Sequence, residues 1–376
     1  MRPARCHAAD AARRRDHPPA TPESPGAPMT TPDQPQSVPP ADARPRVAVL
    51  LTGGTIGSGG HDDQDRLDYV DLAKVLTDEE ALPLYRFPDD ITVYTRRFSR
   101  IRSNDASAEF WLRLRQSILD TIADDPDVAG IVIAHGTATL EETAYFLHLT
   151  VPTDVPIVVV GAQRPPTSMN SDAQLNLANA VRVAASPAAV GHGVLVAMDD
   201  EILSARDVMK TDNHRLSTFK ARDHGRLGDI DPYGQVWFYR KLLRLHTTAS
   251  RFAVELPEYT TPLPRVDIVT MYSGADEFAL TAAIAHGARG VVLASLPPSM
   301  NPTAVDAAID DAIASGVTIV QSSRAISGRV VQRHGFDDRG VIASDTLSPQ
   351  ASRLLLMLCL AAGLSRAEII AAFASY

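Results

Sequence analysis

Threonine side chains follow an apolar segment near the start of the sequence. Residues 47–51 are all apolar and lead directly into Thr52-Gly53-Gly54-Thr55. A short continuous apolar run predicts a strand that is buried on both faces, as in a parallel sheet. The two glycines allow the backbone to turn sharply and to approach a ligand closely. We therefore expect the hydroxyls of Thr52 and Thr55 at the carboxyl end of a parallel strand, where open α/β sheets bind ligands.

A glycine-rich turn after a strand also suggests a phosphate or dinucleotide site, but the sequence matches neither motif. A phosphate-binding loop carries Gly-x-x-x-x-Gly-Lys-Ser/Thr, and a dinucleotide site carries Gly-x-Gly-x-x-Gly at the start of a helix. No lysine follows the turn, and residues 57–63 have the composition of a polar loop. Two interpretations remain: a plain turn, or a turn that presents a reactive threonine.

Two more hydroxyl-bearing turns follow predicted buried strands. Thr137 and Thr139 come after residues 130–134, and Ser295 comes after residues 290–294. Because parallel strands end at the same edge of a sheet, threonines on neighbouring strands can share one cleft. A threonine hydroxyl is a weak nucleophile unless a base lies beside it.

Lysine is one base that can activate a threonine, provided that burial lowers the lysine pKa. The chain has only four lysines, which are Lys74, Lys210, Lys220 and Lys241. Lys210 follows a strand-like stretch. In a chain that prefers arginine, a retained lysine suggests a group that must be able to lose its proton. The alternative interpretation is a solvated surface lysine.

Composition argues against several other classes of protein and site. The net charge of −9 and the pI near 5.6 provide no basic surface for nucleic acid. No apolar run approaches the roughly 18 residues of a membrane span. The histidines show no metal-binding spacing, and Cys6 and Cys359 support neither a disulfide framework nor a metal cluster. We interpret His135 as a packed, hydrogen-bonded residue rather than a base.

Strands and helices alternate along the chain, which is typical of an α/β fold built on parallel sheets. Predicted strands lie at 47–51, 91–94, 130–134, 156–161, 193–198, 266–271, 290–294 and 317–324. Predicted helices lie at 69–76, 108–120, from 140 onward, at 176–185, 278–286 and 303–314, and two amphipathic helices close the chain. Ser107 is expected to cap the helix that starts at residue 108.

Changes in composition divide the chain into four parts. Residues 1–45 lack hydrophobic periodicity and are expected to form a disordered extension. Residues 46–245 are expected to form a large N-terminal catalytic domain, and residues 265–376 a smaller C-terminal domain. Residues 246–264, where Thr, Ser and Pro recur, are expected to link the two domains.

The first residues also bear on where translation starts and where the protein acts. Arg13-Arg14-Arg15 is basic, but no apolar stretch follows it, so no secretory signal is predicted. The cytoplasm is therefore the expected location. Met29 is an alternative start to Met1.

Several segments resemble the signature stretches of the bacterial L-asparaginase/glutaminase family. They lie at 52–56, 135–144, 161–165, 206–211, 322–324 and 344–350, and the resemblance extends from residue 46 to the C-terminus. It implies a large N-terminal and a smaller C-terminal α/β domain, and a homotetramer assembled from dimers, or a homodimer. It also implies hydrolysis of the side-chain amide of L-asparagine, or of a related amide, through an acyl-threonine and without a cofactor.

The resemblance assigns roles to individual residues by their place in the motifs. Thr55 corresponds to the nucleophile, and Tyr69 to the tyrosine that assists it. Thr137 and Lys210 correspond to the second threonine and to the lysine that activates it.

Other motif positions correspond to substrate-binding residues. Ser103 and Asn104 correspond to the loop that holds the α-carboxylate of the substrate. Gly54, Gly136 and position 138 lie in the two threonine-bearing turns, and backbone amides at strand ends can serve as an oxyanion hole.

The chain departs from the family pattern at Ala138. The family motif is His-Gly-Thr-Asp-Thr, in which the aspartate binds the α-ammonium of the substrate. Three hypotheses therefore stay open. The first is an asparaginase-type amidohydrolase, and the second is a hydrolase for an amide or ester without a free α-ammonium. The third is a catalytically silent homologue that acts by binding, or an ammonia-producing subunit of an amidotransferase.

Overall fold

The structure is a computed structural model of the 376-residue chain. It describes residues 44–72, 75–98, 100–254 and 262–376. The expected N-terminal extension, apart from residues 44 and 45, and the alternative start at Met29 lie outside these residues. So does the segment 255–261 of the expected linker.

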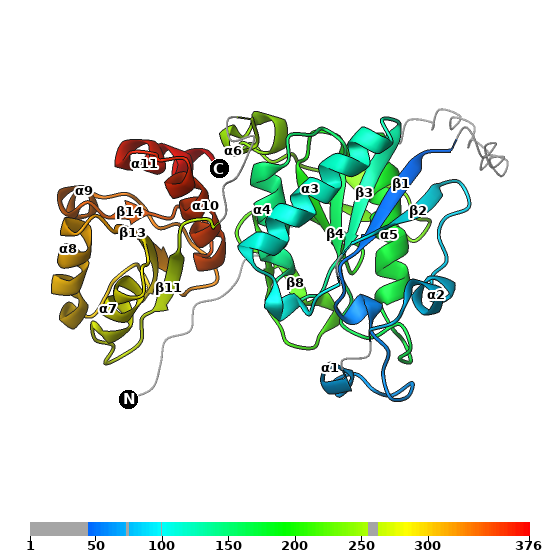
Figure 1. Cartoon of the computed structure of the whole chain (residues 1–376), viewed down its shortest axis with the longest axis horizontal. Helices are drawn as coiled ribbons and strands as arrows, with labels where there is room; N and C mark the ends of the chain where they lie inside the picture. Colours follow the sequence, from blue (N-terminus) through cyan, green and yellow to red (C-terminus); the bar gives the residue numbers. More distant parts are fainter. Residues whose placement is uncertain (1–43, 73–74, 99, 255–261) are drawn as a thin grey trace, which may run out of the picture. The chain divides into compact units, whose positions relative to one another are not determined.

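The first sheet has eight strands, and β1 lies inside its parallel part (Figure 1). In spatial order the strands are β10 (Val236–Phe238), β9 (Gly228–Ile230), β6 (Glu201–Ser204), β5 (Val194–Met198), β4 (Ile157–Val160), β3 (Val128–Ala134), β1 (Arg46–Leu51) and β2 (Thr92–Arg97). β1 pairs in parallel with both β2 and β3. The side chains of residues 47–50 are at most 1% exposed, which is why this strand has a continuous apolar sequence.

In the first sheet, the parallel arrangement expected from the alternation of strands and helices holds for β1 to β5 only. β6 pairs antiparallel with β5 and β9, and β10 pairs antiparallel with β9. β7 (Val208–Lys210) and β8 (Phe219–Ala221) form a separate two-stranded antiparallel sheet. These strands have three or four residues each, which is too short for a clear period in the sequence.

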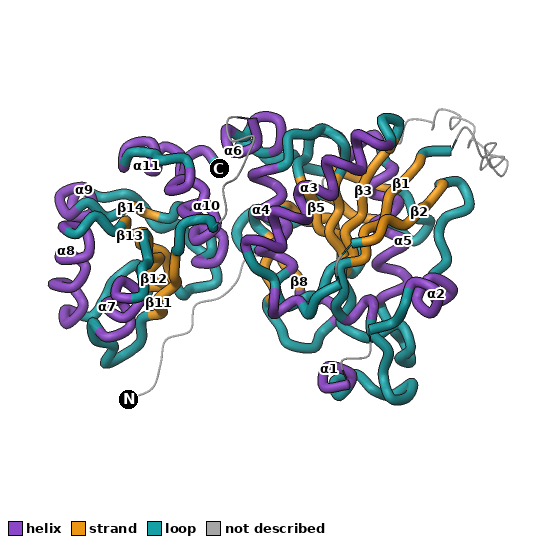
Figure 2. The backbone as a smooth tube through the Cα atoms, viewed as in Figure 1, coloured by secondary structure: helices purple, strands orange, loops and turns teal. Residues whose placement is uncertain are grey.

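Helices cover both faces of the first sheet (Figures 1 and 2). α3 (Ala108–Asp124) and α4 (Leu140–Thr150) lie on one side of the strands, and α5 (Ala173–Ala185) lies on the other. The side chain of Ser107 caps α3 by accepting a hydrogen bond from the amide of Phe110 at 3.3 Å, as expected.

Three shorter helices accompany the first sheet, namely α1 (Tyr69–Leu72), α2 (Asp78–Ala81) and α6 (Arg251–Val254). The helix predicted at 69–76 is wrong in length. Val75 instead forms an isolated antiparallel bridge with Ser58, and this tertiary pairing overrides the helical spacing of the sequence.

The second sheet has four strands, all parallel, in the order β11 (Val266–Thr270), β12 (Gly290–Ser295), β13 (Thr318–Ser323) and β14 (Ile342–Ala343). Its helices are α7 (Phe278–Ala285), α8 (Asp306–Ala314), α9 (His334–Arg339), α10 (Pro349–Ala361) and α11 (Arg366–Ser375). α9 and β14 were not predicted, because six and two residues are too few to show a period. Among the described residues, no helix combines the length and the apolar character needed to cross a membrane.

Candidate active site

The end of β1 brings two threonines to the carboxyl edge of the first sheet, and they serve different purposes. The backbone amide and the hydroxyl of Thr52 both donate to the carbonyl of Ala134, over 3.0 and 3.1 Å. Thr52 therefore joins β1 to the end of β3. Thr55 lies one turn further along and has a hydroxyl that is not used in this way.

Two glycines make the turn between these threonines possible. Gly53 and Gly54 have φ values of 108° and 83°, a region that other residues rarely adopt. The chain then forms a 3-10 turn from Thr55 to Gly57. Thr55 is 9% exposed, so its hydroxyl lies in a largely enclosed position.

Tyr69 from α1 meets Thr55. The phenol oxygen of Tyr69 and Oγ1 of Thr55 are 2.8 Å apart. Burial raises the pKa of Tyr69, and the hydrogen bond with Thr55 opposes this effect. The carboxylate of Asp65 accepts the backbone amide of Tyr69 at 3.1 Å, so Asp65 holds the start of α1 in place.

The loop that carries Asp65 is itself attached to the segment that follows β4. The amide of Gly60 donates to the hydroxyl of Thr167 over 2.9 Å, and the hydroxyl of Ser168 donates to the carbonyl of Asp65. The position of Tyr69 thus depends on contacts between residues about a hundred positions apart. No local pattern in the sequence reveals them.

Thr137 forms the second pair, with Lys210 from the end of β7. Nζ of Lys210 lies 2.8 Å from Oγ1 of Thr137. Burial lowers the pKa of Lys210, while the nearby carboxylates of Glu141 and Asp212 act in the opposite direction. A lysine with a lowered pKa is neutral more often and can accept a proton from a hydroxyl.

The two threonine-bearing turns touch each other. A Cβ atom added at Gly54 would lie 2.1 Å from Cα of Gly136, and one added at Gly136 would lie 2.6 Å from Cβ and Oγ of Ser103. The hydroxyl of Thr139 donates to the carbonyl of Ser103 over 2.6 Å. The turns after β1 and β3 and the Ser103 segment therefore form one compact group.

Three polar or small residues at this group are accessible to solvent. Asn104 and Asp105 belong to a 3-10 turn with Ser103 and are exposed, and Nδ2 of Asn104 donates to Oδ1 of Asp105 over 3.2 Å. Ala138 is also exposed. The structure thus brings together all the site residues expected from the sequence, namely Thr55, Tyr69, Thr137, Lys210, Ser103, Asn104, Gly54, Gly136 and Ala138.

His135 is a packed residue, as predicted. It is 1% exposed, Nδ1 lies 2.8 Å from the carbonyl of Gly136, and Nε2 lies 3.1 Å from the hydroxyl of Thr143. Nε1 of Trp111 donates to the same hydroxyl over 2.9 Å. Burial lowers the pKa of His135 to about 4, so the ring is neutral at physiological pH.

Ser295, the third hydroxyl after a buried strand, belongs to the second sheet. Its hydroxyl donates to Oδ1 of Asn301 over 2.7 Å and accepts from Nε2 of Gln321 over 2.7 Å. These partners make Ser295 part of a buried polar network with two amide side chains.

The sequence did not single out two residues that hold the site. Asp65 received no prediction, and Glu141 was seen only as part of a motif. In the structure, Oε2 of Glu141 accepts the backbone amide of Lys210 over 2.5 Å. The only signal for Glu141 in the sequence was its position, since it is a charged residue at the start of the helix that follows Thr137.

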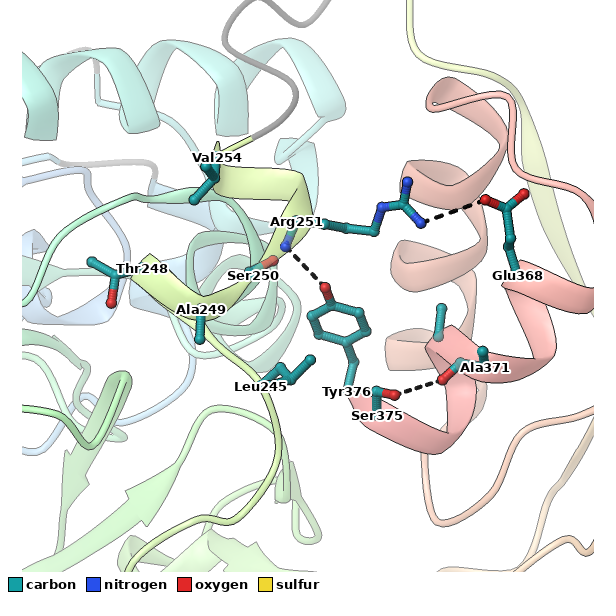
Figure 3. Close-up of a pocket in the computed structure, with 11 residues that line it drawn as sticks. Leu245, Thr248, Ala249, Ser250, Arg251, Val254, Glu368, Ala371, Ser375 and Tyr376 are labelled. Carbon is teal, nitrogen blue, oxygen red and sulfur yellow. Dashed lines mark hydrogen bonds and ion pairs between the residues drawn. The ribbon is translucent and has the colours of Figure 1, made fainter.

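A pocket of about 540 Å³ lies elsewhere, between residues 245–254 and α11 (Figure 3). The phenol of Tyr376 accepts the backbone amide of Arg251 over 2.9 Å, and Arg251 lies 3.8 Å from Glu368. No candidate catalytic residue lines this pocket. The chemistry therefore points to the strand ends rather than to this cavity.

The arrangement at the strand ends can perform nucleophilic chemistry. One hydroxyl, on Thr55, is paired with a phenol, and another, on Thr137, is paired with a lysine of lowered pKa. Such pairs can attack a carbonyl and transfer the released proton. In the described part of the chain, no group of three or more His, Cys, Asp or Glu side chains is arranged to hold a metal ion.

Comparison with known protein families gives two matches that together span most of the chain. Residues 46–244 match the asparaginase N-terminal domain, and residues 265–373 match the glutaminase/asparaginase C-terminal domain.

Individual relatives extend this similarity. The chain is 37% identical to L-asparaginase 2 of Bacillus subtilis over 92% of this chain and 90% of that protein. It is 36% identical to the glutaminase-asparaginase of Pseudomonas aeruginosa over 86% and 88%. The crystal structure of a probable cytoplasmic L-asparaginase from Campylobacter jejuni superposes with a TM-score of 0.78 at 34% identity, over 89% of this chain and 100% of that one. The chain therefore belongs to the L-asparaginase/glutaminase family and is an amidohydrolase of the asparaginase type.

Proposed function

We propose that the protein hydrolyses the side-chain amide of L-asparagine, or of a closely related amide, to aspartate and ammonia through an acyl-threonine. The observation that carries this proposal is the contact between two turns, one with the Thr55–Tyr69 pair and one with the Thr137–Lys210 pair. Membership of the family supplies the class of substrate, a small amide.

In the first half-reaction, Oγ1 of Thr55 attacks the amide carbonyl and forms an ester, and the C–N bond breaks to release ammonia. Tyr69 is placed to relay the proton, because its phenol oxygen is 2.8 Å away: the phenol takes the proton of the Thr55 hydroxyl while its own proton passes to the leaving nitrogen. In the second half-reaction, water attacks the ester, releases the carboxylic acid and returns a proton to Thr55. Lys210, when neutral, takes this proton from the attacking water through Thr137 and gives it back to Oγ1 of Thr55 as the ester bond breaks.

Recognition of the substrate falls to the residues around the two turns. We assign Ser103 and Asn104 to the α-carboxylate of the substrate, since both belong to the 3-10 turn beside Gly136. The backbone amides of the turns at Gly54 and Gly136 are candidates for an oxyanion hole.

Three variants of the chain test the roles of Thr55 and Lys210. Thr55→Ala should abolish ammonia release, and acid quenching of the parent during turnover should reveal an aspartyl ester on the Thr55 peptide by mass spectrometry. Lys210→Met should lower the rate by about 10²–10⁴, the usual contribution of a positioned proton transfer. Lys210→Arg should be nearly as damaging, because arginine keeps its proton.

Lys220→Met is the matched control for Lys210→Met. Lys220 lies on β8 and pairs with Glu201 at 3.3 Å rather than with Thr55 or Thr137. This variant should keep the parental rate. Parental activity of Thr55→Ala would overturn the assignment of the nucleophile. Equal losses of rate in Lys210→Met and Lys220→Met would overturn the assignment of Lys210.

A second candidate substrate class follows from Ala138, which brings no charge to the exposed side of the turn. A substrate α-ammonium bound there lacks the carboxylate that the family motif provides. Loss of one partner of a buried charge pair costs about 2–5 kcal/mol, or roughly 30-fold to several thousand-fold in affinity. An amide or ester without a free α-ammonium avoids this loss.

Steady-state kinetics on asparagine and N-acetylasparagine distinguish the two classes. If the ammonium lacks a partner, Ala138→Asp should raise kcat/KM for asparagine and leave it unchanged or lower for the acetylated compound. Asp105, in the adjoining turn, is an alternative anchor for the ammonium. If the parent is already efficient on asparagine and Ala138→Asp is worse, another acid binds the ammonium.

We also propose a homotetramer, or a homodimer, acting in the cytoplasm. The assembly is supported by the resemblance to the family, and the location by the description of the Campylobacter relative as cytoplasmic. Light scattering on the purified protein and fractionation of the producing cells test these two points.

A further inference from the structure

The carboxylate of Glu141 connects the helix that follows Thr137 to the strand that carries Lys210. Glu141 is the second residue of α4, and Lys210 is the last residue of β7. Oε2 of Glu141 accepts the backbone amide of Lys210 over 2.5 Å. Because β7 belongs to a two-stranded sheet of its own, this bond ties Lys210 directly to the segment that contains Thr137.

The charges around Glu141 come from several elements. Lys210 on β7 and Arg222 after β8 are the positive groups that act on its carboxyl, and Glu142 on the same helix is the negative one. Asp212, after β7, acts on Lys210 rather than on Glu141. Glu142 lies 3.7 Å from Arg353, so it has a cationic partner of its own.

We propose that Glu141 is a positioning residue for the Thr137–Lys210 pair: its carboxylate fixes the backbone at Lys210, and its negative charge acts on the lysine ammonium. The proposal rests on the proposed roles of Thr137 and Lys210. It assigns Glu141 no contact with the substrate.

Two effects of Glu141 can be separated. The first is geometric, because the bond from the Lys210 amide keeps Nζ within 2.8 Å of Thr137. The second is electrostatic, because an ionised Glu141 favours the protonated form of Lys210 and so opposes its action as a base. Burial raises the pKa of Glu141 to about 7, so the electrostatic effect should grow as the pH passes through neutrality.

Glu141→Gln isolates the electrostatic effect, because the glutamine oxygen can still accept the Lys210 amide. Below pH 6 the parent carboxyl is largely protonated, and the two proteins should have similar kcat/KM. Above pH 7 the variant should have more neutral Lys210, and the lysine inflection in its kcat/KM profile should lie about one pH unit lower, which is a tenfold change in the protonation equilibrium.

Glu141→Ala removes the geometric effect as well. A misplacement of about 1 Å in a reacting group can lower a rate by about 10², so this variant should lose about that much below pH 6, and its lysine inflection should shift as in Glu141→Gln. Glu142→Gln is the matched control, since it makes the same change one residue along the same helix. This control keeps the Glu141 carboxylate and its bond to Lys210, so its lysine inflection should stay at the parental pH, although loss of the Glu142 charge should lower the pKa of Glu141.

The protonation of Lys210 can also be measured without activity. With four lysines in the chain, the rate of acetylation of Lys210 by acetic anhydride can be followed by peptide mass spectrometry across pH. The parent should show two steps in the acetylation rate, one near pH 7 from Glu141 and one at higher pH from Lys210 itself. Glu141→Gln should show only the lysine step, at a lower pH than the lysine step of the parent. If Glu141→Gln does not fold, a single step in the parent overturns the proposal.

The outcomes separate this inference from the proposed function. Parental activity of Lys210→Met would remove the role of Lys210, and the proposed function would fail first. Loss of activity in Lys210→Met, with identical pH and acetylation profiles for the parent, Glu141→Gln and Glu142→Gln, would overturn the role of Glu141 alone.

Discussion

Gly54→Ala should disable the site by separating the two threonine-bearing turns. Gly54 has φ 83° and ψ −175°, a conformation that is open almost only to glycine. An alanine Cβ at this position would lie 2.1 Å from Cα and 2.5 Å from the amide nitrogen of Gly136. Both contacts are with backbone, so no side chain can rotate away to relieve them.

Backbone strain and steric overlap together determine how much stability Gly54→Ala should lose. A non-glycine residue in such a conformation costs about 1–3 kcal/mol, and an extra methyl group in a packed site typically costs about 1–3 kcal/mol more. The free energy of unfolding should therefore fall by roughly 2–6 kcal/mol if the turns keep their positions. If they move apart by about 1 Å instead, the rate should fall by about 10².

Urea unfolding and steady-state ammonia release measure these two outcomes in one preparation. Gly57→Ala is the control, because Gly57 lies three residues away and no atom would come within 4 Å of an added Cβ. Its stability and rate should stay near those of the parent. If Gly54→Ala and Gly57→Ala are indistinguishable in both measurements, the contact between the turns has no functional importance.

Three further predictions follow from single contacts. Thr55→Ser should keep measurable ammonia release, because the nucleophilic hydroxyl survives; a complete loss would mean that the methyl group positions it. Ser107→Ala should lower the free energy of unfolding by about 1 kcal/mol in a urea titration, since it removes the α3 cap, and an unchanged midpoint would contradict that role. The pKa of buried His135 is lowered to about 4, so its protonation favours the unfolded chain and stability should fall as the pH drops from about 6.5 to 4. At pH 5 the free energy of unfolding should be lower by about 2 kcal/mol than at neutral pH for this reason. The urea midpoint of His135→Gln should therefore change less between pH 7.5 and pH 5 than that of the parent.

The strands and helices with a clear period were predictable from the sequence, and so were the residues at their ends. The apolar run before Thr52 predicted β1, and Ser107 predicted the start of α3. The short antiparallel strands were not predictable, because three or four residues show no period and their partners are distant in the chain. The position of Lys210 depends on one of these strands, β7, so its contact with Thr137 was suggested by the family motif alone.

Burial explains why Glu141 was missed. A glutamate at the start of a helix normally faces solvent, and only the packing of β7 against α4 gives Glu141 the Lys210 amide as a partner. The role of Asp65 was hidden for a similar reason, because the polar residues around it indicate only a loop. In both cases the sequence contains the residue but not the distant backbone group that it binds.

The Thr55–Tyr69 pair and the Thr137–Lys210 pair lie on segments that differ in their contact with solvent. Tyr69 starts α1 after an exposed loop in which Asp65 accepts the amides of His61, Leu67 and Tyr69. Thr137 instead follows β3, which is almost entirely buried. Amide hydrogens of such a loop exchange with solvent through local opening, while those of a central strand exchange only when the whole domain unfolds. We therefore expect the amide of Tyr69 to exchange with deuterium faster than the amides of β3, so that the contact between Tyr69 and Thr55 can break while the first sheet stays folded.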